Sequence, residues 1–267
     1  MSYSSLAAKE SATSQISYQA PYSSIVLHIP HAKSDTPDDI RQALSFNSIL
    51  HDRSRSYIDW FTDELFVPST PHPRIHSIIF PWSRIFCDVE RLPHDPLEAK
   101  GLGISMYRWD SLRDNADYVR TKCYSCYMAH QRAVEDILID CCKNGRESLC
   151  SYPPVLLIGC HSFSSEPTEL CHKPSDIDIC LGYNDDWSRP SDAVLQRVTE
   201  YFQEKGYKVG LNVPFSNSKT VDAPVDYHSL MIEVSKRLYM NEETLEKSSK
   251  FETLQSDVQE LYPFLLR

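Results

Sequence analysis

The sequence predicts a single α/β domain, with a mostly parallel, mixed sheet flanked by helices on both faces. The main observation is Val155–Ile158, a run of four branched apolar residues that is typical of a strand buried on both faces. Strand-like apolar runs recur at Ser24–Ile29, Ile75–Phe80 and Leu230–Val234, and helical patterns separate them. Strands that alternate with helices favour a parallel sheet covered on both sides.

The length and net charge of the chain indicate its domain organisation and exclude some classes of partner. The chain has 267 residues, of which 41% are hydrophobic, so one large domain over 21–267 is expected, preceded by a flexible arm over 1–20. The formal net charge of −10 argues against nucleic acid and anionic membranes as partners. No apolar run approaches the roughly 18 residues that span a bilayer. Because no secretory signal is visible, we expect a cytoplasmic protein. We expect it to be a monomer or a homodimer.

The first half of the chain carries two short helical patterns and one long one. Thr36-Pro37 supplies a cap and a first-turn proline for a helix that opens at residue 37. Residues 57–66 have helical apolar spacing, which would place Asp59 and Asp63 on a solvated face. Arg84–Val89 is expected to continue or pair with the second strand, and 93–103 to form a loop. Leu112–Lys143 predicts a long helix.

The second half predicts two shorter strands and two further helices. Asp176–Gly182 and Tyr207–Val213 are the strand candidates. Ser191–Lys205 is amphipathic, with Ser191 as a cap and Gly206 as a stop, and residues 242–262 end the chain in a helix.

The cysteines are expected to be reduced. There are nine, an odd number, in a chain without a visible secretory signal. Cys123 and Cys126 have a CxxC spacing but lie within the long helical pattern without a second pair. Ordinary buried cysteines therefore explain them better than a structural zinc site does.

Residues able to bind metal or move protons stand at the ends of the four apolar runs. His31 follows the first run, Asp88 and Glu90 follow the second, and His161 follows the central one. Glu233 lies inside the last run, where an unpaired carboxylate would cost several kcal/mol. Because the carboxyl ends of parallel strands meet at one edge of a sheet, we expect these residues to converge there.

Two histidines and one carboxylate, with one position left for water, form a catalytic zinc arrangement. His31, Glu90 and His161 fit the ligand role, and Glu233 fits the general base that takes a proton from the metal-bound water. Three arginines, at positions 84, 91 and 237, lie close in sequence to these groups. Guanidinium groups bind carboxylates and polarise carbonyls, so they imply an acyl substrate with an anionic end.

With these motifs in place, the chain resembles the N-formylglutamate amidohydrolase family. The matching segments lie in the family's order over roughly residues 24 to 243. They are Ile29-Pro30-His31-Ala32, Cys87-Asp88-Val89-Glu90-Arg91, Glu98, Gly101-Leu102-Gly103, Gly159-Cys160-His161-Ser162-Phe163, Asp178-Ile179-Cys180-Leu181-Gly182, Asn212-Val213-Pro214-Phe215, Met231-Ile232-Glu233-Val234 and Arg237-Leu238-Tyr239-Met240.

The resemblance implies a fold like that of the zinc carboxypeptidases and aspartoacylases, a phosphorylase- and hydrolase-like class. It also implies one zinc ion and hydrolysis of an N-formyl amino acid, or another N-acyl amino acid, such as N-formyl-L-glutamate. Glu233 and Arg91 are then the catalytic residues, with Glu233 as base and later as acid toward the leaving amine. The substrate-binding residues are Arg84, Arg237, Asn212 and Tyr107.

Departures from the related patterns leave alternatives open. Carboxypeptidases and aspartoacylases take two ligands from one His-x-x-Glu, but Ser34 stands three residues after His31 here. The carboxylate ligand is therefore assigned to Glu90, with Asp88 as second choice. The family's Asn-Arg after the last-strand glutamate is Ser235-Lys236 here. A carboxypeptidase-like peptidase and an inactive ligand-binding relative are the alternative functions.

Two further histidines are expected to lie outside the chemistry. His130, in the long helix, is interpreted as a core or surface residue rather than a catalytic one. His28 precedes Ile29 in the first strand, and strand alternation would point it away from the side that His31 occupies.

Overall fold

The computed structural model confirms a single α/β unit with a mixed sheet. The predicted N-terminal arm, Tyr107 and the first residues of the predicted long helix lie outside the described residues. The structure describes residues 22–43, 57–93, 95, 96, 98, 102–106, 115–144, 155–164 and 175–266.

Six strands form the main sheet, in the order β2-β1-β3-β6-β4-β5. The first four are parallel to one another, and β4 pairs antiparallel with β6 while β5 runs parallel to β4. The two central strands are buried at every position, as expected for strands covered on both faces. The strands are β1 (Ser24–Ile29), β2 (Ile75–Ile79), β3 (Val155–Phe163), β4 (Ile179–Gly182), β5 (Val209–Leu211) and β6 (Tyr227–Ser235).

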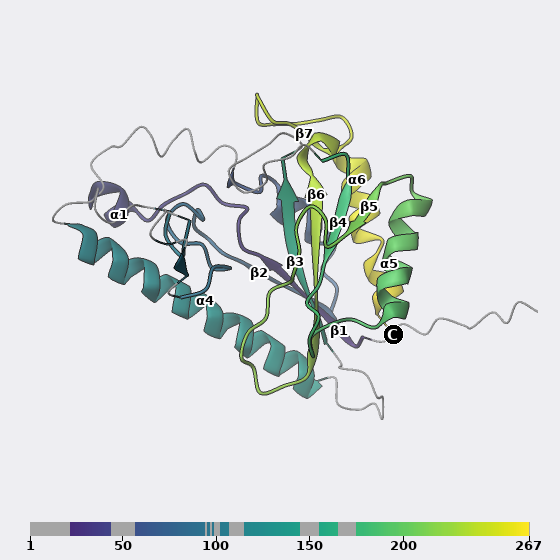
Figure 1. Ribbon diagram of the computed structural model, residues 1–267, viewed down its shortest axis with the longest axis horizontal. Coiled ribbons are helices and arrows are strands. Elements are labelled where there is room, and N and C mark those ends of the chain that lie inside the picture. The colour runs from purple at the N-terminus through teal and green to yellow at the C-terminus, as the bar shows by residue number, and fades with distance from the viewer. Residues whose placement is uncertain are drawn as a thin grey trace, which may run out of the picture.

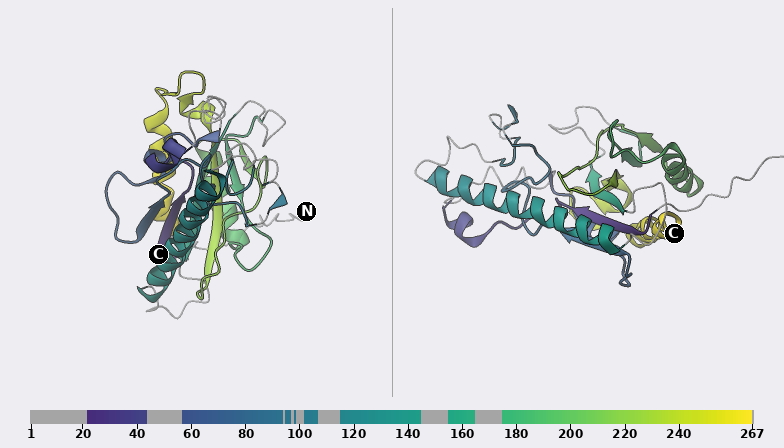
Figure 2. Two further views of the ribbon diagram at one scale, coloured as in Figure 1. Left: turned by 90° about the vertical axis from the view of Figure 1, so that its left-hand side faces the viewer. Right: turned by 90° about the horizontal axis from the view of Figure 1, so that it is seen from below.

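Helices cover both faces of this sheet. The long helix α4 crosses one face, and α5 and α6 lie against the other (Figures 1 and 2). We call the two sides the α4 face and the α5 face. The helices are α1 (Asp38–Ala43), α3 (Thr62–Phe66), α4 (Ala116–Asn144), α5 (Asp192–Glu204), α6 (Phe251–Gln259) and α7 (Tyr262–Leu265).

Alternation along the strands divides the apolar side chains between the two layers. Val26 and Leu157 belong to a buried cluster with Val134 and Leu138 of α4. The intervening strand residues pack into the larger cluster with α5 and α6. The first half of α4 extends beyond the sheet and packs on the 80–89 segment in a third cluster, so α4 joins the sheet to the loops at its end.

Three predicted elements differ from the structure. Arg84–Val89 forms consecutive turns rather than a strand. The 57–66 helix is shortened to α3, because Phe61 adopts a left-handed backbone with φ of 64° just before it. The expected helix over 242–262 is preceded by a small hairpin, β7 (Met240–Asn241) with β8 (Glu246–Lys247), before α6 begins.

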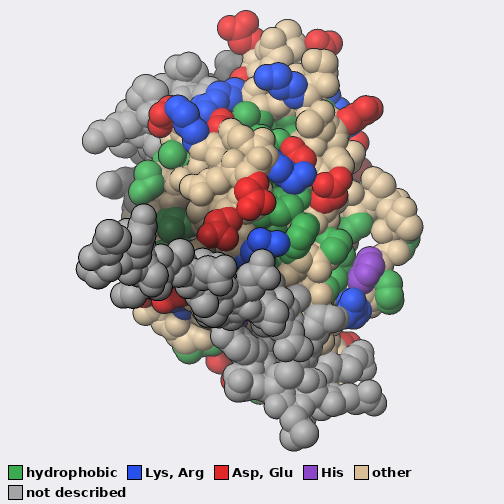
Figure 3. Space-filling model, turned by 90° about the vertical axis from the view of Figure 1, so that its right-hand side faces the viewer, with side chains coloured by type: hydrophobic (Ala, Val, Ile, Leu, Met, Phe, Trp, Pro, Cys, Tyr) green, Lys and Arg blue, Asp and Glu red, His purple; other side chains and the backbone are tan. Residues whose placement is uncertain are grey.

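The surface and the thiols agree with the composition. On the face seen from the α5 side, acidic and basic side chains are interspersed (Figure 3). Among the described helices, none combines the length and apolar character needed to cross a bilayer. All seven cysteines in the described ranges are free thiols, and six of them are buried.

Candidate metal centre

The site forms at the carboxyl ends of three parallel strands, on the α4 face. His161 of β3 lies directly beside Glu233 of β6 in the sheet register, so both side chains project from the same face. His31 follows β1 after a single proline, and its carbonyl accepts a hydrogen bond from the backbone N–H of Asp59. That bond docks the 57–61 segment beside the strand ends.

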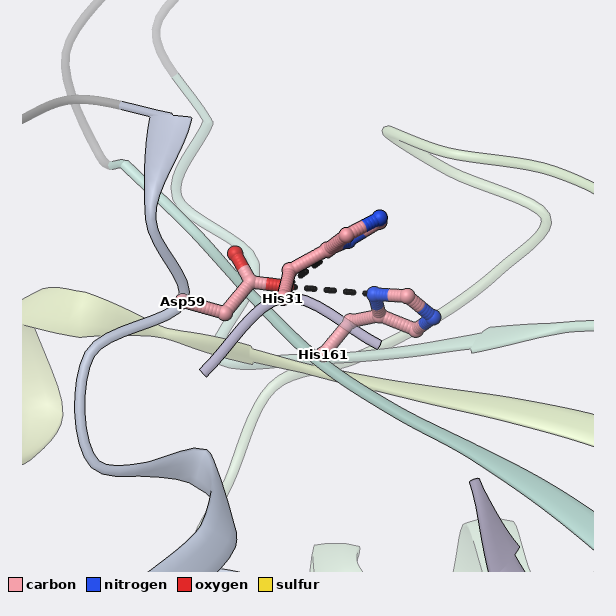
Figure 4. A group of neighbouring side chains, drawn as sticks. All are labelled: His31, Asp59 and His161. Carbon is pink, nitrogen blue, oxygen red and sulfur yellow. Dashed lines mark hydrogen bonds and ion pairs between the residues drawn. The ribbon is translucent and has the colours of Figure 1, made fainter. Parts of the chain in front are cut away.

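His31, Asp59 and His161 form a buried cluster whose potential ligand atoms lie within 4.8 Å of one another. Oδ2 of Asp59 is 3.1 Å from Nδ1 of His161 and 3.5 Å from Nδ1 of His31. Figure 4 shows both imidazoles turned toward this carboxylate. The Nδ1 atoms of His31 and His161 and the Oδ2 atom of Asp59 therefore lie around a common point.

Asp59 is the residue that sequence patterning misplaced. It was expected on a solvated helix face, but only 3% of it is exposed. The helix begins later than the apolar spacing suggests, and Asp59 lies in the turn before it, where its carbonyl accepts a hydrogen bond from the Thr62 hydroxyl. The available signal was an acid beside Tyr57 and Ile58, both of which are buried here.

Glu90, the carboxylate expected to bind the metal, and Asp88, the second choice, lie at the opposite ring nitrogens. Oδ1 of Asp88 is 2.9 Å from Nε2 of His31, and Oε2 of Glu90 is 3.1 Å from Nε2 of His161. Each imidazole is thus held between Asp59 on its Nδ1 side and a second carboxylate on its Nε2 side. This is the arrangement in which outer carboxylates orient metal-binding histidines.

The electrostatics of the cluster favour charged carboxylates. Burial opposes ionisation of Asp59, but the hydrogen bond from His161 and the nearby imidazole of His31 hold its pKa below the ordinary range. Burial likewise opposes ionisation of Glu90, and the nearby His161 charge lowers its pKa. The charge of Glu90 and the hydrogen bond to Asp59 outweigh burial and raise the pKa of His161. The buried carboxylates and the His161 imidazole therefore stabilise one another's charged forms.

The donor set fits a divalent transition metal. Nδ1 of His31 is buried and has no hydrogen-bond partner among the described residues, although it lies 3.5 Å from Oδ2 of Asp59. An orphaned buried nitrogen is costly unless a further group satisfies it. Two imidazole nitrogens and one carboxylate oxygen are a common protein ligand set for catalytic zinc.

Glu233 lies beside the cluster with a perturbed proton affinity. It is 8% exposed, and burial raises its pKa to about 7, with the charges of Asp59 and Glu90 acting in the same direction. Lys236, just past the end of β6, is also buried, and burial lowers its pKa. A carboxyl with a pKa near neutrality suits proton transfer at physiological pH.

Two of the predicted arginines reach the site through Asp88. Arg84 donates to Oδ2 of Asp88 through Nε at 3.2 Å and Nη2 at 2.7 Å. Together with the charge of His31, this pair keeps the pKa of Asp88 below its ordinary range despite burial. Nε of Arg91 lies 3.5 Å from the same oxygen, and 23% of its side chain is exposed. Arg91 is therefore the more accessible of the two guanidinium groups.

The other predicted substrate contacts lie in separate networks or outside the described residues. Arg237 donates to the carbonyls of 175–177 and to the Asp178 carboxylate, so its bonds hold the loop before β4. Asn212 has a left-handed backbone, and its side-chain oxygen accepts from Tyr183 and Asn217. Tyr107 is outside the described residues. Arg237 and Asn212 thus make structural contacts in this conformation.

Comparison with known proteins assigns the chain to a family. Residues 23–240 match the model of the N-formylglutamate amidohydrolase family, and the chain belongs to that family. Its fold is similar to N-formylglutamate amidohydrolase from Ralstonia eutropha JMP134, with 21% identity, 92% coverage of each chain and a TM-score of 0.69. A gene product from Agrobacterium tumefaciens is similar at 15% identity, with 92% and 88% coverage and a TM-score of 0.54. No curated protein sequence matches the chain significantly.

Proposed function

We propose that this protein is a metal-dependent amidohydrolase that cleaves the amide bond of an N-formyl amino acid, or another N-acyl amino acid, such as N-formyl-L-glutamate. The observation that carries the proposal is the His31–Asp59–His161 cluster beside Glu233, at the strand ends of a chain that belongs to the N-formylglutamate amidohydrolase family. The cluster supplies a metal-ligand set, and Glu233 supplies a carboxyl whose pKa is near neutrality.

In this proposal His31, Asp59 and His161 hold the ion, for which zinc is the best candidate. Asp59 takes the place that the sequence led us to give to Glu90, because it faces both Nδ1 atoms. Glu90 and Asp88 then accept the Nε2 protons of the two imidazoles, which leaves the Nδ1 lone pairs for the metal. A zinc ion bound there would supply a Lewis acid that makes water more acidic.

Glu233 is the general base in this account. Its carboxylate accepts a proton from the attacking water and then delivers that proton to the leaving amine nitrogen. Its position opposite His161 in the register keeps it beside the cluster without giving it a ligand role. Because burial raises its pKa to about 7, both protonation states are accessible near neutral pH.

Arg91 is the proposed contact for a substrate carboxylate or the developing oxyanion. It lies next to Glu90 in the chain and is more exposed than Arg84, whose guanidinium is held closely by Asp88. A charge-assisted hydrogen bond from guanidinium to carboxylate is directional and strong. The anionic end of an N-acyl amino acid suits such a group.

The proposal is tested by loading the purified protein with Zn²⁺ and measuring formate release from N-formyl-L-glutamate. N-acetyl-L-glutamate and a glutamate-containing dipeptide serve as comparison substrates. The proposal expects one Zn²⁺ per chain and hydrolysis of the formyl or acetyl compound above the dipeptide. Dipeptide cleavage alone would favour a peptidase. Zinc binding without any hydrolysis would point to an inactive ligand-binding relative.

A further inference from the structure

Two buried histidines outside the cluster are joined to each other. His28, near the carboxyl end of β1, and His130, in the middle of α4, have their Nε2 atoms 2.8 Å apart. Both were expected to lie outside the chemistry, yet both are buried, and strand alternation places His28 on the same face as His161. A hydrogen bond between two imidazole nitrogens requires that one of them carries the proton and the other does not.

The histidine pair also approaches the Glu90 carboxylate, which lies at Nε2 of His161. Nδ1 of His28 lies 3.3 Å from Oε1 of Glu90, a close contact that is not hydrogen-bonded in this structure, and the other oxygen of Glu90 is 3.1 Å from Nε2 of His161. The turn that carries Glu90 is also fixed from α4 and from a neighbouring loop. Gln131 donates to the carbonyl of Val89 at 2.7 Å, and Lys219 donates to the same carbonyl at 3.1 Å. The backbone next to Glu90 is therefore held from two sides.

The protons in this series of side chains can be assigned by starting from its two ends, His130 and Glu90. Burial lowers the pKa of His28 and takes the pKa of His130 to about 3, so both rings are neutral at pH 7 and carry one proton each. A carboxylate only accepts, so the proton of His28 belongs on Nδ1, facing Glu90. Nε2 of His28 is then a lone pair, and His130 must supply the proton in the bond between the two rings.

We propose that His130 and His28 are positioning residues for the metal centre: His130 donates to His28, His28 directs its Nδ1 proton toward Glu90, and Glu90 is thereby held to accept the Nε2 proton of His161, which leaves Nδ1 for the metal. The inference rests on the proposed function, since it concerns the same site. It extends that site by two side chains and assigns the ring protons between α4 and His161.

The position of the ring protons is the first test and needs no substitution. Long-range ¹⁵N–¹H correlation spectra of the purified metal-free protein at pH 7 distinguish Nδ1–H from Nε2–H imidazoles. The proposal expects the Nδ1–H form for His28 and the Nε2–H form for His130. The opposite pair of forms, or a protonated His28, would overturn it.

Zn²⁺ affinity, measured by competition with a chelator, is the second test. Removal of an outer-shell partner commonly costs about 10–100-fold in metal affinity, so His28→Leu and His130→Leu should weaken binding, His130→Leu by about tenfold. His130→Gln keeps an N–H donor near the Nε2 position and should restore affinity close to that of the parent. His228→Gln is the matched control, because His228 is a buried histidine bonded to Tyr22 instead, and it should leave affinity unchanged.

The outcomes separate this inference from the proposed function. If the parent protein binds Zn²⁺ and neither leucine variant binds it more weakly, the positioning role is wrong while the proposed function stands. Equal losses in His130→Leu and His130→Gln would also overturn the role, because packing rather than proton donation would then explain them. If the parent protein binds no Zn²⁺, the proposed function fails, and the positioning role fails with it whatever the ring-proton positions are.

Discussion

Replacing Glu233 with glutamine should remove catalysis while keeping the shape of the site. Glutamine cannot accept the proton that the proposed mechanism requires. A positioned general base contributes about 10²–10⁴-fold in rate, so kcat/KM of the Zn²⁺-loaded variant should fall by that factor. Zinc affinity should stay close to that of the parent, because Glu233 is not among the clustered ligands.

The same variant should also change how the free energy of unfolding depends on pH. Burial raises the pKa of Glu233 from 4.5 to about 7, so the folded state holds this proton more tightly than the unfolded state does. The stabilisation is fully present below pH 4.5 and is lost as the pH rises to 7. Linkage between these two pKa values gives a loss of about 2 kcal/mol between pH 5.5 and pH 8. Because glutamine does not ionise, the Glu233→Gln variant should not lose this stability as the pH rises.

Urea unfolding of the metal-free parent and variant at pH 5.5 and pH 8 measures this difference. The parent should lose about 2 kcal/mol more than the variant over that interval. Parallel pH dependences would show that Glu233 titrates as an ordinary exposed acid. Formate release by the variant at the parent rate would separately exclude Glu233 as the base.

Three further predictions concern the metal, the substrate and the core. Chelation of the metal should abolish hydrolysis. Zn²⁺ at about 100 times its Kd should stabilise the metal-free fold by ~2.7 kcal/mol, which a higher Tm would show. An unchanged Tm would argue against a metal in this cluster. Arg91→Ala should lower kcat/KM for N-formyl-L-glutamate by about 10–100-fold, from the loss of a charge-assisted hydrogen bond, and Arg91→Lys by less; equal activity would exclude Arg91. Leu157→Ala should lower the free energy of unfolding by about 2–5 kcal/mol in urea titrations without changing zinc affinity, since Leu157 is fully buried under α4; a loss below 1 kcal/mol would contradict that packing.

The sheet could be predicted because its central strands are continuous apolar runs. A strand such as Val155–Phe163 leaves a clear sequence signal, and parallel strands bring their carboxyl ends together. His31, His161 and Glu233 were therefore placed near one another from sequence alone. The register that sets His161 beside Glu233 agrees with that expectation.

The carboxylate between the histidines could not be predicted in the same way. Asp59 lies in a turn whose position depends on the left-handed backbone of Phe61, and phenylalanine is not a residue type that signals such a backbone. The apolar spacing of 57–66 therefore suggested a longer helix. Asp88 and Glu90 were placed near the site correctly, but the turns of 84–90 decide which ring nitrogen each one reaches.

The histidine pair was missed for a related reason. His28 lies three residues before His31, and strand alternation suggested opposite sides, but the chain leaves the strand at Pro30, so alternation does not extend to His31. His130 is one of many residues on a long helix. Only the packing of α4 on the sheet brings its ring to His28.

The proposed mechanism depends most on which carboxylate binds the metal, and cysteine variants loaded with Co²⁺ test this directly. A thiolate bound to Co²⁺ produces a charge-transfer absorption that an outer residue does not produce. Asp59→Cys should show this absorption, and Glu90→Cys, the matched control, should not. The absorption in Glu90→Cys, together with its absence in Asp59→Cys, would contradict the assignment of His31, Asp59 and His161 as the metal ligands.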